Sequence, residues 1–226
     1  MKKAVILLSG GLDSATTLYF AKDSGYECFC LIFDYGQRHK RELESAKAIA
    51  KKAECRWRIV KISLPWKGSS LLDKRSRLST IDYRPSTTIP STYVPARNII
   101  FLSFALSCAE AMGAKSIFIG ANAIDYSGYP DCRPEFYNAF IKAANLGTKA
   151  GVEGKGIKIV TPLIRKTKAQ IIRLGMGLGV PYGLTWSCYR GARNPCGRCD
   201  SCNFRTKGFI EAGIKDPLKS LGSLGV

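Results

Sequence analysis

Residues 4–16, AVILLSGGLDSAT, decide the fold, because an apolar run, two adjacent glycines and a polar helix start follow one another without a break. Residues 4–8 are continuously apolar and predict a buried β-strand. Residues 13–22 have the composition of a helix that begins directly after the glycine turn. A strand, a tight turn and a helix in this order are typical of an α/β domain with a parallel sheet.

The glycine turn is suited to binding an anion. Its glycines allow a close backbone approach, and Ser9, Ser14 and Thr16 place hydroxyls at the positive end of a helix. The turn lacks the lysine of a Walker loop, which favours holding a pyrophosphate over transferring a γ-phosphate. Asp13 is then a candidate magnesium ligand. The alternative is a plain glycine turn with a serine or aspartate cap.

The rest of the chain continues this alternation of strands and helices. We predict further strands at residues 27–33, 57–62, 116–120 and 157–164, and further helices at residues 41–53, 98–111, 134–145 and 167–179. Thr167 and Gln170 have the spacing of a capping box. The predicted fold class is therefore α/β: a doubly wound, mainly parallel five-stranded sheet with helices on both faces.

Polar segments follow three of the predicted strands, at residues 9–16, 34–39 and 120–135. Because ligands in such sheets bind beyond the carboxyl ends of the strands, we expect the three segments to converge on one site. Residues 1–184 are predicted to form the α/β domain, and residues 185–226 a small C-terminal segment packed on it. Residues 65–96 are rich in proline, serine and threonine and predict a long loop.

The composition is that of a globular protein with a large basic excess. Thirty-five lysines and arginines face 17 acidic residues, a formal net charge of +18, which favours polyanions or serves solubility alone. The basic residues are scattered in short clusters rather than gathered in one tract. The N-terminal apolar run is shorter than a signal peptide requires, and residues 99–109 are too few to span a bilayer. We therefore expect no membrane association and a cytoplasmic location.

Four of the nine cysteines crowd near the C-terminus with the spacing C-x7-C-x2-C-x2-C: Cys188, Cys196, Cys199 and Cys202. Four thiolates at such spacing are the usual ligands of a structural zinc ion, which would pin this segment onto the domain. An iron-sulfur cluster is the alternative, but the Cys-Pro that closes ferredoxin-type runs is absent. Four others lie in apolar or amphipathic segments and are predicted to be small buried side chains: Cys28, Cys30, Cys55 and Cys108.

Several of these stretches carry a family resemblance. SGGLDSAT after a buried strand resembles the PP-loop of the ATP pyrophosphatases, which adenylate a carbonyl oxygen and release pyrophosphate. Longer stretches resemble the family of 7-cyano-7-deazaguanine synthases: DYGQRH at 34–39, VPARN at 94–98, DYSGYPDCRPEF at 125–136, WSCY at 186–189 and NPCGRCDSC at 194–202. DYSGYPDCRPEF is the most discriminating of them, because the PP-loop is shared widely.

The resemblance implies an ATP-dependent carbon-nitrogen ligase that turns 7-carboxy-7-deazaguanine and ammonia into a nitrile. The acid would be adenylated, converted to an amide, and then activated again and dehydrated, with two ATP consumed. AMP and pyrophosphate would be released, in a step of queuosine or archaeosine biosynthesis for tRNA. The implied cofactors are ATP, Mg²⁺ and one structural Zn²⁺. The implied assembly is a homodimer, without a stable nucleic-acid partner despite the charge.

The resemblance also implies roles for individual residues. ATP would be held by the loop itself: Leu8, Ser9, Gly10, Gly11, Leu12, Asp13, Ser14, Ala15 and Thr16. The candidate catalytic residues are Asp13, Arg97 and Lys166. Lys166 and the neighbouring Lys168 flank a predicted helix start, where cations are unfavourable unless an anion binds there, although a solvated helix start is the alternative.

The candidate substrate-binding residues are Tyr126, Asp131, Arg133, Glu135, Phe136 and His39. Guanine presents neighbouring N–H donors that suit a carboxylate, so Asp131 or Glu135 could accept them. Arg133 could meet the substrate carboxylate or the developing phosphate charge, and an aromatic ring could stack on the base. A solvated turn is the alternative for this segment, and an ordinary loop histidine is the alternative for His39.

Two rival functions compete with this interpretation. One is a tRNA-modifying PP-loop enzyme, such as a thiolase, that uses the basic charge for RNA and the cysteines for an iron-sulfur cluster. The other is a zinc-bearing nucleic-acid-binding module without catalysis. The first lacks support from DYSGYPDCRPEF, and the second leaves SGGLDSAT unexplained.

Overall fold

A five-stranded parallel sheet forms the centre of the protein. In the computed structural model the strands are β1 (Lys2–Leu7), β2 (Tyr26–Asp34), β3 (Arg56–Lys61), β4 (Ser116–Ile119) and β5 (Lys158–Val160), in the spatial order β3-β2-β1-β4-β5. All four neighbouring pairs are parallel. The structure describes residues 2–37, 40–66, 69, 71–72, 89–90, 92–122, 128–192 and 194–218. The predicted fold class is confirmed.

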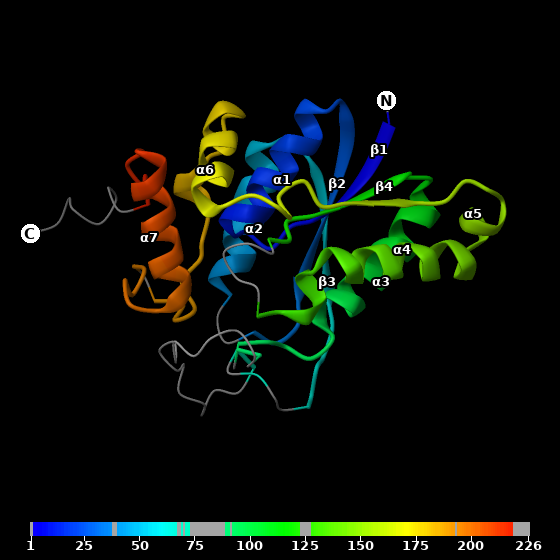
Figure 1. The fold of residues 1–226 in the computed structure, drawn as a ribbon, viewed down its shortest axis with the longest axis horizontal. Coiled ribbons are helices and arrows are strands. Elements are labelled where there is room, and N and C mark those ends of the chain that lie inside the picture. The colour runs from blue at the N-terminus through cyan, green and yellow to red at the C-terminus, as the bar shows by residue number, and fades with distance from the viewer. Residues whose placement is uncertain are drawn as a thin grey trace, which may run out of the picture.

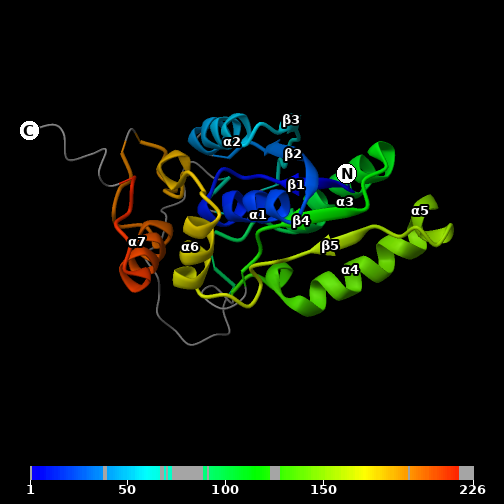
Figure 2. The ribbon, with the colours of Figure 1, turned by 90° about the horizontal axis from the view of Figure 1, so that it is seen from above.

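Helices cover both faces of the sheet (Figures 1 and 2). On one face, α1 (Leu12–Asp23), α2 (Arg41–Lys52) and α6 (Lys168–Gly177) share an apolar cluster with the strands. On the other face, α3 (Arg97–Met112) and α4 (Pro134–Gly147) share a second cluster. The remaining helical segments are α5 (Lys149–Val152), α7 (Asp200–Ala212) and the short 3-10 turns Pro130–Cys132 and Tyr182–Leu184. Figure 1 shows α7 beside α6, at the opposite end of the molecule from α4 and α5.

Several local predictions are confirmed, and one was too long. Thr167 and Gln170 form the predicted capping box at the start of α6, and Pro134 opens α4. The last strand, predicted to extend to residue 164, ends at Val160, because Pro162 cannot donate a ladder hydrogen bond and the chain turns over residues 162–165. The described helices include none long and apolar enough to cross a membrane.

The strand order reverses between β1 and β4, and ligands in such sheets bind at this switch point. The chain packs very closely there. Gly10 has φ +87°, and a Cβ on it would lie 2.3 Å from the carbonyl oxygen of Glu42 and 2.7 Å from the nitrogen of Ala46, both in α2. A Cβ on Gly120, after β4, would lie 2.9 Å from the carbonyl group of Asp13. The two glycines therefore let the loop after β1 sit between α2 and the end of β4.

The close approach of Gly10 to α2 predicts a large loss of stability in Gly10→Ala. Gly25→Ala is a matched control, because Gly25 also has positive φ, at +79°, but no described atom lies within 4 Å of the added Cβ. The control should lose about 1–2 kcal/mol from its backbone conformation alone. Gly10→Ala adds a clash with backbone and should lose roughly 2–5 kcal/mol. Urea unfolding midpoints measure the loss of stability in both variants. Equal losses would show that the close packing of Gly10 against α2 does not contribute to the effect.

Candidate active site

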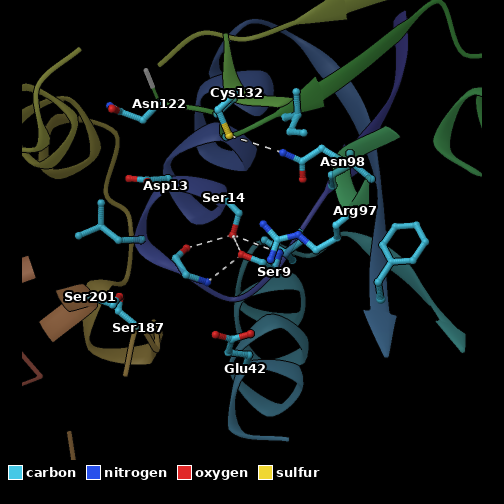
Figure 3. A pocket seen from close by; sticks show the side chains of 18 of the residues that line it. Ser9, Asp13, Ser14, Glu42, Arg97, Asn98, Asn122, Cys132, Ser187 and Ser201 are labelled. Atoms are coloured by element: carbon cyan, nitrogen blue, oxygen red, sulfur yellow. Dashed lines mark hydrogen bonds between the residues drawn. The ribbon is translucent and has the colours of Figure 1, made fainter. Parts of the chain in front are cut away.

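A cavity of about 340 Å³ lies over the carboxyl ends of β1, β2 and β4. Its size is within the usual range for small-molecule sites. All three polar segments that follow strands contribute to its wall, as the sequence predicts. The polar and charged side chains in the wall are Ser9, Asp13, Ser14, Tyr35, Gln37, Glu42, Arg97, Asn98, Asn122, Tyr129, Cys132, Lys168, Trp186, Ser187, Tyr189, Ser201 and Arg205. Figure 3 shows ten of these, which project from different elements around Ser9 and Ser14.

The loop between β1 and α1 is organised by its own hydroxyls. The backbone N–H of Gly11 donates to Ser9 Oγ (3.3 Å), which donates to Ser14 Oγ (3.0 Å), and Ser14 Oγ donates to the carbonyl oxygen of Gly11 (3.0 Å). Among the described residues no side chain caps the start of α1. The first amide groups of the helix therefore face the cavity with the positive end of the helix dipole. This arrangement fits a phosphate or pyrophosphate.

Asp13 forms an ion pair with Lys168 across the cavity wall. Lys168 Nζ lies 2.8 Å from each carboxylate oxygen of Asp13, and it reaches there from the first residue of α6. Lys166, the predicted catalytic lysine, does not contribute to the cavity wall as described, and its backbone oxygen accepts a hydrogen bond from the Asn122 side chain. The structure thus directs the second lysine of this segment, rather than the first, toward the glycine turn.

Arg97 projects into the cavity from the first residue of α3 (Figure 3). The preceding Ala96 has φ +56°, a left-handed conformation that alanine rarely adopts, and its N–H donates to Tyr93 Oη. Burial by itself lowers the pKa of Arg97, but Tyr35, Tyr129 and Asp131 raise it above its ordinary value. Arg97 therefore carries a permanent positive charge at the cavity.

Asp131 lies behind the cavity wall and supports the start of α3. Its Oδ2 accepts the N–H of Asn98 at 3.2 Å, and its backbone oxygen accepts hydrogen bonds from Asn98 Nδ2 and from Tyr137 Oη. Burial raises the pKa of Asp131, although the Asn98 N–H and Arg97 oppose this. The neighbouring Cys132 faces the cavity, and burial beside Asp131 raises the pKa of its thiol to about 12. Asp131 thus acts as a remote cap of α3.

The other predicted ligand-binding residues lie in several different environments. Leu8 and Leu12 line the cavity, whereas Ala15 and Thr16 are buried behind the loop, where Thr16 Oγ1 bonds Tyr182 Oη. Arg133 and Glu135 are exposed, and Phe136 packs beside Tyr137 and Phe140. His39 and Tyr126 lie outside the described residues. The predicted substrate roles of these residues stay predictions.

Several wall residues were not predicted from the sequence. Some belong to quoted motifs: Gln37, Asn98, Cys132, Trp186, Ser187 and Tyr189. Position within those motifs was a usable signal for them. Ser201 also belongs to a quoted motif, NPCGRCDSC, whereas Glu42 and Arg205 gave no local signal, because they lie on helices that only the fold brings to the cavity. Burial raises the pKa of Glu42 to about 7, although the nearby Arg97 lowers it.

The C-terminal cysteines form a compact cluster. The four Sγ atoms lie within 4.8 Å of one another, at Cys188, Cys196, Cys199 and Cys202. Cys188 Sγ also accepts the backbone N–H groups of Arg190 and Cys196. Thiol hydrogen bonds from two neighbouring cysteines, and then these N–H groups, lower the pKa of Cys188 and favour its thiolate. Four converging sulfurs fit a tetrahedral metal ion without an open position.

The segment that carries this cluster also contacts the glycine turn. The backbone N–H of Trp186 donates to the carbonyl oxygen of Gly10 at 2.9 Å, and Trp186 Nε1 donates to the carbonyl oxygen of Cys188 at 2.9 Å. Farther along, the buried guanidinium of Arg205 pairs with Asp216 at 2.8 Å. A metal at the cysteines would therefore hold the segment that braces the glycine turn.

A family model described as "Queuosine biosynthesis protein QueC" matches residues 3–213. The chain belongs to the QueC family. It is 54% identical over 221 residues to the 7-cyano-7-deazaguanine synthase of Stutzerimonas stutzeri, covering 96% of this chain and 98% of that one. It is 56% identical over 220 residues to the enzyme of the same name from Acetivibrio thermocellus, covering 97% of this chain and 98% of that one.

Solved structures share the QueC chain's fold at low sequence identity. The NMN synthetase of Francisella tularensis matches with a TM-score of 0.50 and 18% identity, over 98% of this chain and 81% of that one. A 4-thiouridine synthetase in complex with RNA and ATP matches with a TM-score of 0.50 and 20% identity, over 94% of this chain and 50% of that one. These similarities concern the fold alone.

The position of the two lysines predicts a difference in anion binding. Lys168→Met should weaken the binding of inorganic pyrophosphate roughly 10- to 100-fold, because Asp13 would then face the anion uncompensated. Lys166→Met is the matched control and should change the affinity by about twofold or less, since it retains the Lys168–Asp13 pair. Isothermal titration calorimetry measures both. Equal losses would mean that Lys166 reaches the anion as well.

Proposed function

We propose that this protein converts 7-carboxy-7-deazaguanine, ammonia and ATP into 7-cyano-7-deazaguanine. The observation that carries the proposal is the uncapped start of α1 at a cavity with Arg97 and Lys168 in its wall. That wall suits a substrate set that contains phosphates and a carboxylate. The proposal is supported by relatives more than half identical over nearly the whole chain that carry this enzyme's name. Those relatives do not favour a tRNA thiolase.

ATP would bind with its departing β- and γ-phosphates at the glycine turn. The amides at the start of α1 and the hydroxyls of Ser9 and Ser14 supply neutral donors there, and Lys168 supplies charge. Asp13 would hold Mg²⁺, which supplies charge neutralisation for the phosphates. Arg97 is placed to stabilise negative charge that develops at the α-phosphate or on the substrate carboxylate.

The chemistry requires activation of a carbonyl oxygen twice. A carboxylate is a poor electrophile, and adenylation gives it a good leaving group that ammonia can displace. The resulting amide is activated on its oxygen in the same manner and loses the elements of AMP to form the nitrile. The protein therefore has to position reactants and stabilise phosphate charge, and no covalent protein intermediate is needed. The reaction is that of an ATP-dependent carbon-nitrogen ligase releasing AMP and pyrophosphate.

Substrate recognition would involve the segment after β4. Asp131 and Glu135 stay candidates for accepting the N–H donors of the base, and Arg133 for meeting a carboxylate, together with Phe136, His39 and Tyr126. In the structure Asp131 supports α3 through Asn98, so its substitution would also disturb the neighbouring Arg97. Asn98 and Asn122, which line the cavity, are further candidates because an amide both donates and accepts hydrogen bonds.

We further propose that the four-cysteine site holds one structural Zn²⁺ ion. The donor set of four thiolates supports zinc, and the absence of a Cys-Pro closing the run argues against a ferredoxin-type cluster. A homodimer and the lack of a stable nucleic-acid partner stay predictions of the resemblance, and a cytoplasmic location stays a prediction from the short apolar runs of the sequence. The division into residues 1–184 and 185–226 is likewise a prediction, in which the zinc ion stabilises the second part.

The proposed reaction makes a stoichiometric prediction. Purified protein incubated with 7-carboxy-7-deazaguanine, ammonium and Mg-ATP should form the nitrile with about two AMP per nitrile, because each carbonyl activation releases one AMP. Mass spectrometry of the product and separate chromatography of AMP and ADP measure both quantities. ADP in place of AMP would contradict the pyrophosphate-releasing chemistry, and the absence of a nitrile would contradict the substrate.

The zinc proposal predicts the effect of removing one ligand. Cys202→Ser should lower the zinc content from about one ion per chain to near zero, because the three remaining thiolates do not complete the tetrahedral coordination of the ion. The melting temperature should fall with the loss of zinc. Cys108→Ser is the control, since Cys108 is a partly exposed thiol of α3 outside the cluster. Elemental analysis of the purified proteins decides the outcome. Iron with sulfide in the wild type would contradict zinc.

A further inference from the structure

Five charged side chains line the described part of the cavity wall: Asp13, Glu42, Arg97, Lys168 and Arg205. Two of the cations are neutralised by carboxylates, because Lys168 pairs with Asp13 and Arg205 with Asp216. The carboxylate of Glu42 forms no ion pair and no hydrogen bond with another described residue. It is therefore the one acidic group of the described wall without a partner there, and a negative site of this kind suits a cationic ligand.

Glu42 is held in place by its own backbone. It is the second residue of α2, and its carbonyl oxygen lies against Gly10, so the start of α2 and the glycine turn are packed together. Its side chain is only partly accessible, and Figure 3 shows the carboxylate directed toward Ser9 and the cavity. The carboxylate thus faces the same space as the loop proposed to hold the phosphates, from the side opposite β4.

The proposed reaction has one small cationic substrate. At neutral pH ammonia is almost entirely ammonium, which has no lone pair and cannot attack a carbonyl carbon. An enzyme that draws on the ammonium ion itself has to remove a proton before attack. An anionic group that lies close to the reacting carbonyl and is shielded from water can both bind the cation and accept this proton.

We propose that the carboxylate of Glu42 binds the ammonium ion and accepts one of its protons. This inference rests on the proposed function. In the step, an N–H bond of ammonium breaks and an O–H bond forms on Glu42. The lone pair so released forms the new C–N bond to the adenylated carbonyl carbon, and the C–O bond to AMP breaks. The amide nitrogen loses its second proton to water, and the products are amide and AMP.

The electrostatics of the site agree with this role. Burial is the largest cause of the raised pKa of Glu42, which lies near 7, and the positive charge of Arg97 opposes it. A carboxyl with such a pKa is a much better proton acceptor than an exposed glutamate, and at pH 7 it is still ionised in about half of the molecules. Arg97 would also keep the carboxylate from being neutralised before ammonium arrives.

A structural role for Glu42 is the main alternative. Acidic residues in the first turn of a helix stabilise it through the helix dipole, and Glu42 occupies such a position. Glu44 offers a matched control, because it lies in the same first turn but is exposed. Its Oε2 lies 3.5 Å from Nη1 of Arg41. Glu42→Gln and Glu44→Gln therefore remove the same charge from the same helix end, and only the first alters the cavity.

The experiment compares three activities of the wild type, Glu42→Gln and Glu44→Gln at pH 7, with saturating Mg-ATP. The first is ATP–pyrophosphate exchange dependent on 7-carboxy-7-deazaguanine, which requires no ammonium. The second is amide formation from the acid with ammonium or with hydroxylamine, a nucleophile already largely neutral at this pH. The third is conversion of the supplied amide to nitrile, which also needs no ammonium.

Glu42→Gln should lose roughly 100-fold or more of ammonium-dependent amide formation, the usual contribution of a general base. It should retain exchange, the amide-to-nitrile step and the hydroxylamine reaction within about threefold, and Glu44→Gln should behave as the wild type. A parallel loss with hydroxylamine, or in the amide-to-nitrile step, would overturn the role of Glu42. So would a raised Mg²⁺ requirement for exchange, which would make Glu42 a metal ligand. No acid-dependent exchange in the wild type would overturn the proposed function itself.

Discussion

The contact of Gly10 with its surroundings is the constraint on which the site depends. Its Cα lies against the backbone of α2 at Glu42 and Ala46, and its carbonyl oxygen accepts the N–H of Trp186. Three segments distant in sequence, namely the glycine turn, the start of α2 and the cysteine-bearing segment, therefore meet at one residue without a side chain. Any Cβ there would force the backbone of α2 away, and the segments that build the cavity would separate.

The charge distribution of the cavity follows from the way these segments pack together. The uncapped start of α1 gives a positive potential, Arg97 adds a full charge from α3, and Lys168 of α6 balances the charge of Asp13. Such a wall favours phosphates and carboxylates, and it would disfavour a cation except near its two carboxylates, Asp13 and Glu42. An enzyme that joins an adenylated acid to ammonia has to bind ligands of both signs in one small space. Glu42, the one carboxylate of the described wall without an ion pair there, lies on a separate helix, which is one solution.

The cysteine cluster supports the site without entering it. Trp186 connects the cluster to the glycine turn, and α7, which begins within the cysteine run, packs beside α6, the helix that carries Lys168. Metal binding would thus order two parts of the cavity wall through the backbone. A closed thiolate site suits this purpose, because it stabilises structure without offering reactivity.

The sequence by itself determined the fold class, the glycine turn and the cysteine cluster, because each depends on local patterns: apolar periodicity, adjacent glycines and metal-ligand spacing. It also determined the convergence of three loops, since parallel strands align their carboxyl ends. Only the tertiary structure decided that Lys168 and not Lys166 reaches Asp13, that Asp131 caps α3, and that Glu42 faces the cavity. The direction of a side chain depends on how helices pack across the sheet, and no spacing within one segment encodes that.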